Sequence, residues 1–276
     1  MKLQTALWTG PMVSGITTPM KVLLVQPDVV WEDHAANFEK IRGLLARSAI
    51  DRGSLIVLPE MFATGFSMNL EATLRAESAA GSFLKQLAAE HQCAVIGGLV
   101  SQGQQGMGRN EAVAHGPTGS LLARYCKMQP FTLGGEAGCH EKGEAPVFFE
   151  WDGFVVSPFV CYDLRFPELF RSAARRGAEL LVVIAQWPSR RVQHWVTLLQ
   201  ARAIENQAFV VGVNRSGKDP TLDYPGRSIV VNPMGEIIAD AGAGEGVVSA
   251  ELDVATVLQW RRDFPALQDM RTDLRP

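Results

Sequence analysis

Apolar positions follow two patterns along the chain: short continuous runs, and longer stretches in which they recur every three or four residues. Runs of about four to eight apolar residues are typical of strands buried on both faces, and the longer pattern is typical of amphipathic helices. Strands and helices alternate, which predicts a layered α/β fold. The pattern predicts helices over 35–50, 82–90, 167–176 and 191–206. It predicts strands over 21–25, 54–58, 94–100, 111–115, 121–127, 147–151, 154–156, 159–160, 180–185, 209–214, 228–232, 236–239 and 247–252.

Turn-forming residues separate these elements without marking a domain boundary. Residues 128–146 hold four Gly and two Pro, a loop composition. No internal repeat or linker interrupts the pattern, so we expect residues 20–276 to form a single domain. Residues 1–19 contain two Pro and no continuous apolar core, which argues against a signal peptide. We expect them to be a flexible N-terminal extension, with Met20 as an alternative first residue.

Composition narrows the class of protein and of partner. The chain has 276 residues, of which 47% are hydrophobic and 20% charged, too apolar for a disordered protein. Its net charge of −3 offers no basic surface for nucleic acid or an anionic membrane. No apolar run approaches the roughly 18 residues of a membrane span. We therefore expect a small-molecule partner, and neither nucleic acid nor a membrane.

The four cysteines, at positions 93, 126, 139 and 161, lack CxxC spacing. A chain of this length needs no disulfides to stabilise a core, so we expect a reduced, cytoplasmic protein. Cys139-His140-Glu141 is too short a cluster to predict a metal site, and no second ligand pair accompanies it. We expect no metal and no cofactor.

Three reactive residues share one type of position, because each stands at the C-terminal end of a predicted strand. They are Glu60, Lys127 and Cys161. In α/β sheets ligands bind at strand ends, so these three side chains are candidates for a single pocket. Taken singly, each has an ordinary interpretation: a solvated loop acid, a surface lysine and a small buried apolar residue.

Taken together and in order, the segments around them resemble the three catalytic segments of the nitrilase, or carbon–nitrogen hydrolase, superfamily. These segments are Leu-Pro-Glu-Met-Phe at 58–62, Lys127, and Cys-Tyr-Asp-Leu-Arg-Phe-Pro at 161–167. The similarity runs from Met20 to about Asp269. Within the superfamily the chain is most similar to the YafV-type omega-amidases, through residues 58–66, 186–188 and 201–207.

The resemblance implies a fold and a reaction. It implies a four-layer α-β-β-α sandwich that pairs into a homodimer. It also implies hydrolysis of a small linear amide, 2-oxoglutaramate or 2-oxosuccinamate, to a carboxylate and ammonia. A nitrile hydrolase and an N-carbamoyl amidase remain alternatives on the same residues, and a binding protein without catalysis is a third.

The family mechanism assigns a role to each catalytic candidate. A thiol with an ordinary pKa near 8.5 is mostly protonated at neutral pH, so Cys161 needs a base, and Glu60 takes that role. Lys127 and the backbone N–H of Tyr162 stabilise the oxyanion. A second glutamate of the family corresponds to Glu136. His194 is interpreted as a packing or loop-anchoring residue, since Glu60 and Lys127 already supply the base and the cation.

The substrate-binding candidates are less distinctive. Phe66 and Trp187 either line a pocket or only pack in the interior. A monoamide of a dicarboxylic acid needs a cation for its far carboxylate, and Arg191 is the candidate, with Arg190 as its neighbouring substitute and a solvated side chain as the alternative. Arg165 is expected in an internal ion pair with Asp163 or Glu168, and a role in binding the substrate is the alternative.

Overall fold

Two six-stranded β-sheets lie face to face in the computed structural model of this protein, which describes residues 19–271. The first sheet has the order β14 (Gly246–Leu252), β1 (Met20–Gln26), β2 (Leu55–Val57), β3 (Ala94–Gln102), β4 (Gly108–His115), β5 (Leu121–Cys126). The second has the order β13 (Ile237–Asp240), β12 (Ile229–Val231), β9 (Phe209–Asn214), β8 (Leu180–Ala185), β7 (Phe154–Val160), β6 (Phe149–Trp151). A separate hairpin is formed by β10 (Ser216–Lys218) and β11 (Asp223–Pro225).

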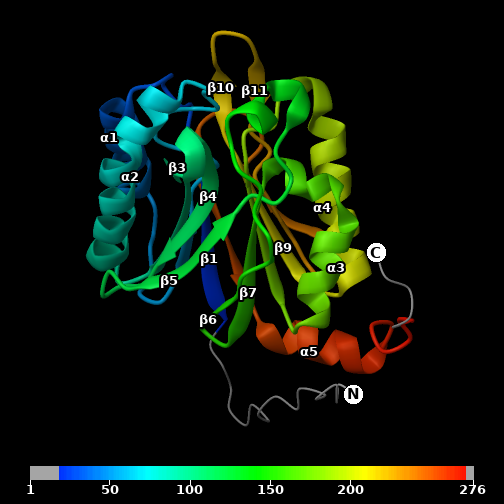
Figure 1. Cartoon of the computed structure of the whole chain (residues 1–276). Helices are drawn as coiled ribbons and strands as arrows, with labels where there is room; N and C mark the ends of the chain where they lie inside the picture. Colours follow the sequence, from blue (N-terminus) through cyan, green and yellow to red (C-terminus); the bar gives the residue numbers. More distant parts are fainter. Residues whose placement is uncertain (1–18, 272–276) are drawn as a thin grey trace.

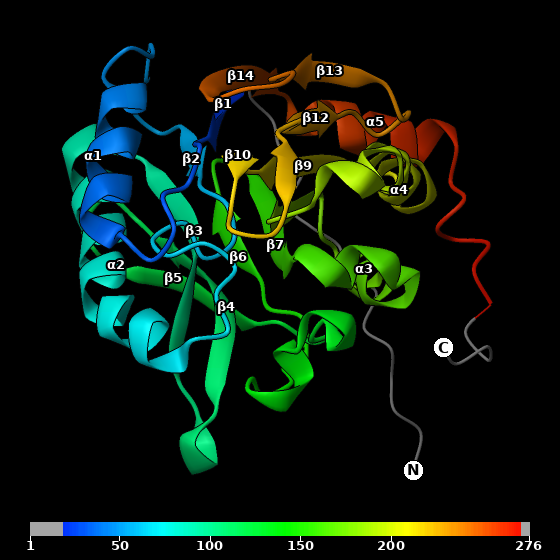
Figure 2. The same ribbon diagram turned by 90° about the horizontal axis from the view of Figure 1, so that it is seen from above.

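Helices cover the outer face of each sheet (Figures 1 and 2). On one side lie α1 (His34–Leu45) and α2 (Leu70–His91), and on the other α3 (Pro167–Arg175) and α4 (Val192–Asn206). A further helix, α5 (Val254–Asp263), follows β14 at one end of the sandwich. Single 3₁₀ turns occupy Gln104–Gly106, Thr132–Gly134, Glu136–Gly138, Cys161–Arg165 and Ser189–Arg191. The four-layer α-β-β-α sandwich predicted from the sequence is therefore confirmed.

The inner strands are apolar on both faces because each face packs against a different layer. In β1, Leu24 points between the two sheets, while Leu23 and Val25 pack under α1 and α2. The central strands β1, β2 and β3 pair in parallel, as do β7, β8 and β9. Parallel strands buried on both sides read as continuous apolar runs, which is why the sequence predicts them well.

Several predicted elements differ from the structure. α2 has 22 residues instead of the nine predicted, because the buried face of its first half consists of small residues such as Ala76 and Ala80. The helix α5 and the β10–β11 hairpin are missing from the prediction. The predicted helix over 35–50 ends at Leu45, and the predicted strand over 147–151 begins at Phe149. Apart from Pro19, the predicted N-terminal extension lies outside the described residues.

The fold brings strand ends from both sheets to one place. Glu60 follows β2 of the first sheet, whereas Cys161 follows β7 and Gln186 follows β8 of the second. The backbone N–H of Gln186 donates to Glu60 Oε2 at 3.0 Å, so the two sheets meet at this point. A site for a ligand at this end of the sandwich is consistent with the general behaviour of open α/β sheets.

Candidate active site

A buried lysine lies between two buried glutamates at the centre of this end. Lys127 Nζ is 2.9 Å from Glu60 Oε1 and 2.8 Å from Glu136 Oε2, and each of the three side chains is at most 1% exposed. Burial by itself would lower the pKa of Lys127, but the negative charges of Glu136 and Glu60 outweigh it and raise that pKa. Lys127 is therefore a fixed positive charge.

Glu136 is held by the loop that the sequence predicts over 128–146. Its Oε2 accepts the backbone N–H of Phe131 at 2.6 Å, within the turn formed by residues 131–136. Burial would raise the pKa of Glu136, but the charge of Lys127 and a hydrogen bond from Asn110 lower it on balance. Glu136 is accordingly an ionised partner of the lysine.

Gln186 holds Glu60 and the segment of chain that follows it. Its backbone N–H occupies one carboxylate oxygen of Glu60, and its side-chain Nε2 donates to the Glu60 carbonyl at 2.7 Å. Its Oε1 accepts the backbone N–H of Phe66 at 3.1 Å. The sequence prediction cited Gln186 only for its resemblance and gave it no role.

Cys161 stands at a sharp turn between β7 and the 3₁₀ turn Cys161–Arg165. Its φ of 49° lies in the left-handed region, which a non-glycine residue adopts only at an energetic cost. Asp163 supports the turn: Oδ2 accepts the backbone N–H of Val160 at 3.0 Å and the hydroxyl of Tyr125 at 2.8 Å. Its Oδ1 accepts the backbone N–H of Gln129 at 2.9 Å.

The surroundings of Cys161 favour the protonated thiol. Burial is the largest cause and raises the pKa of Cys161 well above its ordinary value, and the charge of Glu60 adds to it. Lys127 and the backbone N–H of Gln186 lower that pKa to a smaller extent. A protonated thiol is a weak nucleophile, so reaction at Cys161 requires a base nearby.

Cys161 opens into a cavity of about 290 Å³. Its wall includes Tyr162 and all three substrate-binding candidates, Phe66, Trp187 and Arg191. The Phe66 ring lies 5.4 Å from Lys127 Nζ, and Trp187 Nε1 donates to the backbone carbonyl of Arg191 at 2.8 Å. Aromatic walls with few convergent polar groups are typical of small-molecule sites.

Three arginines line the same cavity. They are Arg165, Arg190 and Arg191, and none forms an ion pair with any residue in the range 19–271. Burial, followed by the charges of Arg190 and Arg165, lowers the pKa of Arg191. This cationic wall is suited to an anionic group on a ligand.

The predicted ion pair of Arg165 with Asp163 or Glu168 is wrong. Asp163 is buried and turned toward three donors on the interior side of its turn, so it does not meet the guanidinium. Arg165 instead lies 4.9 Å from the Trp187 ring centroid and 3.3 Å from Nδ1 of His194.

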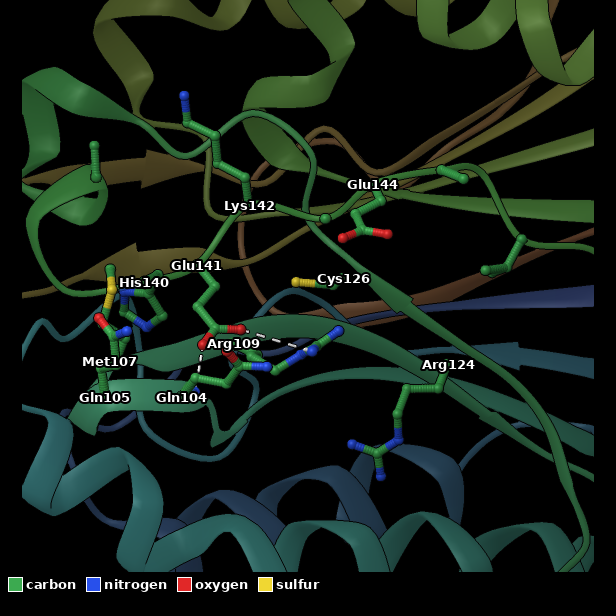
Figure 3. A pocket seen from close by; sticks show the side chains of 14 residues that line it. Gln104, Gln105, Met107, Arg109, Arg124, Cys126, His140, Glu141, Lys142 and Glu144 are labelled. Atoms are coloured by element: carbon green, nitrogen blue, oxygen red, sulfur yellow. Dashed lines mark hydrogen bonds and ion pairs between the residues drawn. The ribbon is translucent and has the colours of Figure 1, made fainter.

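A larger cavity, of about 660 Å³, lies on the face of β4 and β5 that carries Arg109, Arg124 and Cys126 (Figure 3). In its wall Arg109 pairs with Glu141 at 3.7 Å, and both Arg109 and Arg124 pair with the buried Glu111, which does not line the cavity. Neither Cys161 nor Lys127 lines it. The smaller cavity is therefore the candidate active site.

Residues 19–271 contain neither a metal-binding cluster of side chains nor a helix that could span a membrane. Cys139 Sγ lies 3.2 Å from Nδ1 of His140, but no group of three or more His, Cys, Asp or Glu within this range is arranged to hold a metal ion. No helix in the same range is long and apolar enough to cross a membrane.

Cys161, Glu60 and Lys127 thus lie at one end of an α-β-β-α sandwich, the arrangement that the resemblance to the nitrilase superfamily predicts. The carbon–nitrogen hydrolase family model matches residues 21–262. The chain belongs to the carbon–nitrogen hydrolase family, and it is an enzyme that hydrolyses amides.

Several proteins are similar to this chain over most of its length. The chain is 38% identical to omega-amidase YafV from Yersinia enterocolitica, over 91% of this chain and 96% of that protein. It is 32% identical to 2-oxoglutaramate amidase from Bacillus subtilis, over 91% of this chain and 97% of that protein. Among solved structures, XC1258 from Xanthomonas campestris, a CN-hydrolase superfamily protein with an arsenic adduct in its active site, superposes with a TM-score of 0.84 at 34% identity. That match covers 94% of this chain and 99% of XC1258.

Proposed function

We propose that this protein hydrolyses the terminal amide of a 2-oxo dicarboxylic acid monoamide, 2-oxoglutaramate or 2-oxosuccinamate, through a thioester on Cys161. One observation carries the proposal: Cys161 shares its cavity with three arginines, none of which forms an ion pair with any of the described residues. In addition, the pKa of Cys161 responds to the charges of Glu60 and Lys127. A nucleophile and a carboxylate-binding wall in one cavity fit a substrate with an amide at one end and a carboxylate at the other.

In the first step, Glu60 accepts the thiol proton as the sulfur attacks the amide carbon. Lys127, Asn110 and Gln186 occupy three lone-pair sites of the Glu60 carboxylate, whose two oxygens offer about four. One site on Oε2 is left to receive the proton. Glu60 then passes this proton to the departing amine, so that ammonia leaves and the thioester remains.

The negative charge on the carbonyl oxygen is stabilised by Lys127 and the backbone N–H of Tyr162. Two of the three Lys127 hydrogens serve Glu60 and Glu136, which leaves one for the oxyanion. A single donor of this kind contributes about 3–4 kcal/mol to the transition state in comparable sites. Water, deprotonated by Glu60, then hydrolyses the thioester to the acid and the free thiol.

The substrate class is supported by the arginines and by the relatives. Two relatives are named for omega-amidase or 2-oxoglutaramate amidase activity. Arg191 is our candidate for binding the far carboxylate, and Phe66 and Trp187 contact the short carbon chain. A cavity of about 290 Å³ accommodates a five-carbon acid and leaves room for water.

An ammonia-release assay tests the proposal. 2-Oxoglutaramate and 2-oxosuccinamate are compared with glutamine, pentanamide, a nitrile and an N-carbamoyl amino acid, with Cys161→Ala as the blank. We expect the kcat/KM of a 2-oxo acid amide to exceed that of every other compound by at least about tenfold, since a carboxylate–arginine contact contributes 1.5–3 kcal/mol. Faster ammonia release from the nitrile or the carbamoyl compound would replace the proposed substrate class.

The proposal extends to the assembly and its location. Residues 20–276 act as one catalytic domain, since the site draws on both sheets, and two such chains form a cytoplasmic homodimer. All four cysteines are free thiols, as expected in a reducing compartment. Light scattering of the purified protein should give about twice the chain mass of 30.1 kDa. A mass near that of one chain would remove the dimer from the proposal.

A further inference from the structure

One buried amide connects the two glutamates of the site. Asn110 lies in the middle of β4 and is 1% exposed. Its Nδ2 donates to Glu60 Oε1 at 2.7 Å and to Glu136 Oε1 at 2.7 Å, so each amide hydrogen serves a different carboxylate. Its Oδ1 has no hydrogen-bond partner among the described residues.

The chemistry of the neighbours determines which way this amide points. Turned over, Asn110 would place Oδ1 at 2.7 Å from two carboxylate oxygens, and three acceptors would face one another. The observed orientation satisfies both glutamates at the cost of one unpaired buried oxygen. A buried acceptor without a partner is unfavourable for folding. This arrangement therefore orders the two carboxylates and lowers the stability of the fold.

The backbone of the same residue holds the lysine. The Lys127 N–H donates to the Asn110 carbonyl at 2.9 Å. Its neighbours in β4, Arg109 and Glu111, lie on the opposite face of the sheet, where Arg109 lines the larger cavity of Figure 3. Asn110 is thus the residue of this strand segment that contacts Glu60, Lys127 and Glu136 together.

We infer that Asn110 is a positioning residue, which fixes the direction of the Glu60 carboxylate and keeps Glu136 on the other side of Lys127. Without the amide, two buried carboxylates share one ammonium and the pair takes up a proton more readily. This inference rests on the proposed function, in which Glu60 must be ionised before it accepts the thiol proton.

Three variants distinguish this role from packing. Asn110→Asp keeps the shape but replaces donors with acceptors, Asn110→Ser keeps one donor, and Asn110→Ala keeps none. We expect Asp to be at least as damaging as Ala and Ser to be the mildest. A role in packing alone predicts that the isosteric Asp variant stays closest to the parent enzyme.

Two readouts are measured against pH for each variant. One is kcat and KM for 2-oxoglutaramate, and the other is the rate at which iodoacetamide alkylates Cys161, read by mass spectrometry of its peptide. In Asn110→Ala we expect kcat to fall at least about tenfold with KM within about threefold, and the acidic limb of both profiles to move up by about one pH unit. Alkylation needs no substrate, so it reports on Asn110 even if the proposed substrate is wrong.

Asn206→Ala is the matched control, because Asn206 is fully buried at the end of α4 and contacts none of these residues. It should lose stability and keep the pH profiles of the parent enzyme. The inference is overturned if the acidic limbs of the pH profiles do not move in the Asn110 variants. It is also overturned if Asn110→Asp is the least damaging of the three substitutions. Failure of every amide to react, with shifted alkylation profiles, overturns the substrate proposal and leaves the role of Asn110 intact.

Discussion

The backbone N–H of Gln186, at the end of one sheet, donates to Glu60 Oε2, at the end of the other, at 3.0 Å. The same N–H lowers the pKa of Cys161, against the larger opposite effect of burial. One peptide group is therefore shared between the proposed base and the proposed nucleophile. The contact depends on how the two sheets meet, so packing between the sheets is part of the proposed catalytic arrangement.

Replacing the nucleophile should abolish activity without unfolding the protein. Cys161→Ala removes the sulfur at a partly exposed position, and the alanine loses little packing. We expect ammonia release to fall at least about a thousandfold, which corresponds to about 4 kcal/mol in the barrier. Far-ultraviolet circular dichroism should be unchanged, and Cys139→Ala, outside the cavity, should keep the parent rate. Residual activity above a tenth of the parent would show that the nucleophile is misassigned.

The two glutamates should respond differently to the same change. Glu60→Gln removes the proton acceptor, so thioester formation and thioester hydrolysis should both fail, with kcat lower by about 10²–10⁴-fold. Glu136→Gln removes a partner of Lys127 and should lower kcat less. Steady-state kinetics on 2-oxoglutaramate measures both variants. Equal losses would contradict separate roles as base and positioning group.

Lys127→Met tests the buried cation. Two buried carboxylates would then lack their ammonium, so we expect the free energy of unfolding to fall by about 3–5 kcal/mol together with a loss of turnover. Urea unfolding measures the first effect and ammonia release the second. Lys85→Met on the solvent face of α2 is the control and should change neither. An active Lys127→Met enzyme would remove the lysine from the mechanism.

The raised pKa of Asp163 determines how the stability of the fold should depend on pH. Burial raises the pKa of Asp163 to about 7, although hydrogen bonds from Val160 and Tyr125 and the charge of Lys127 oppose the rise. In the unfolded chain the value is about 3.9, so between pH 4 and 7 the native state binds the extra proton. This contribution to stability is fully present below about pH 4 and is lost as the pH rises through about 7.

Urea unfolding at pH 5, 6 and 7 measures this slope. Asp163→Asn loses acceptors and is less stable throughout, but its free energy of unfolding should fall less with pH, by up to about 1.4 kcal/mol per pH unit relative to the parent protein. Tyr125→Phe removes a donor to the carboxylate, which should raise the pKa of Asp163 further and move the loss of stability to higher pH. Parallel slopes in all three proteins would contradict the raised pKa.

Local patterns in the sequence predicted a layered α/β fold and most strand ends, whereas the four-layer sandwich was predicted only through the family resemblance. Glu60, Lys127 and Cys161 all follow the strands that the sequence indicated. The role of Asn110 could not be predicted, because this residue lies within a strand and its hydrogen-bond partners are 50 and 26 residues away in the sequence. The direction of Arg165 was mispredicted because sequence neighbours of opposite charge do not reveal that Asp163 is already saturated by other donors.

The last prediction concerns the far carboxylate of the substrate. Arg191 lines the cavity, lies 5.5 Å from the Phe131 ring centroid, and has its pKa lowered by burial and by Arg190 and Arg165. The three guanidinium groups repel one another, so an anion bound between them is stabilised by all three charges. Arg191→Ala should therefore raise the KM for 2-oxoglutaramate by about 10–100-fold, the loss expected for a charge-assisted hydrogen bond, and leave pentanamide, a neutral amide of equal length, within about twofold.

Arg190→Ala and Arg165→Ala are measured beside it, since both side chains line the same cavity and differ in exposure. If Arg191 binds the carboxylate, the ratio of KM values for the charged and the neutral substrate rises most in Arg191→Ala. If the ratio rises only in Arg165→Ala, the carboxylate lies closer to the nucleophile turn and beside Trp187, where Arg165 is placed. Equal losses on both substrates in all three variants would mean that the arginines support the cavity wall without binding the carboxylate, and the substrate class would then need another cation.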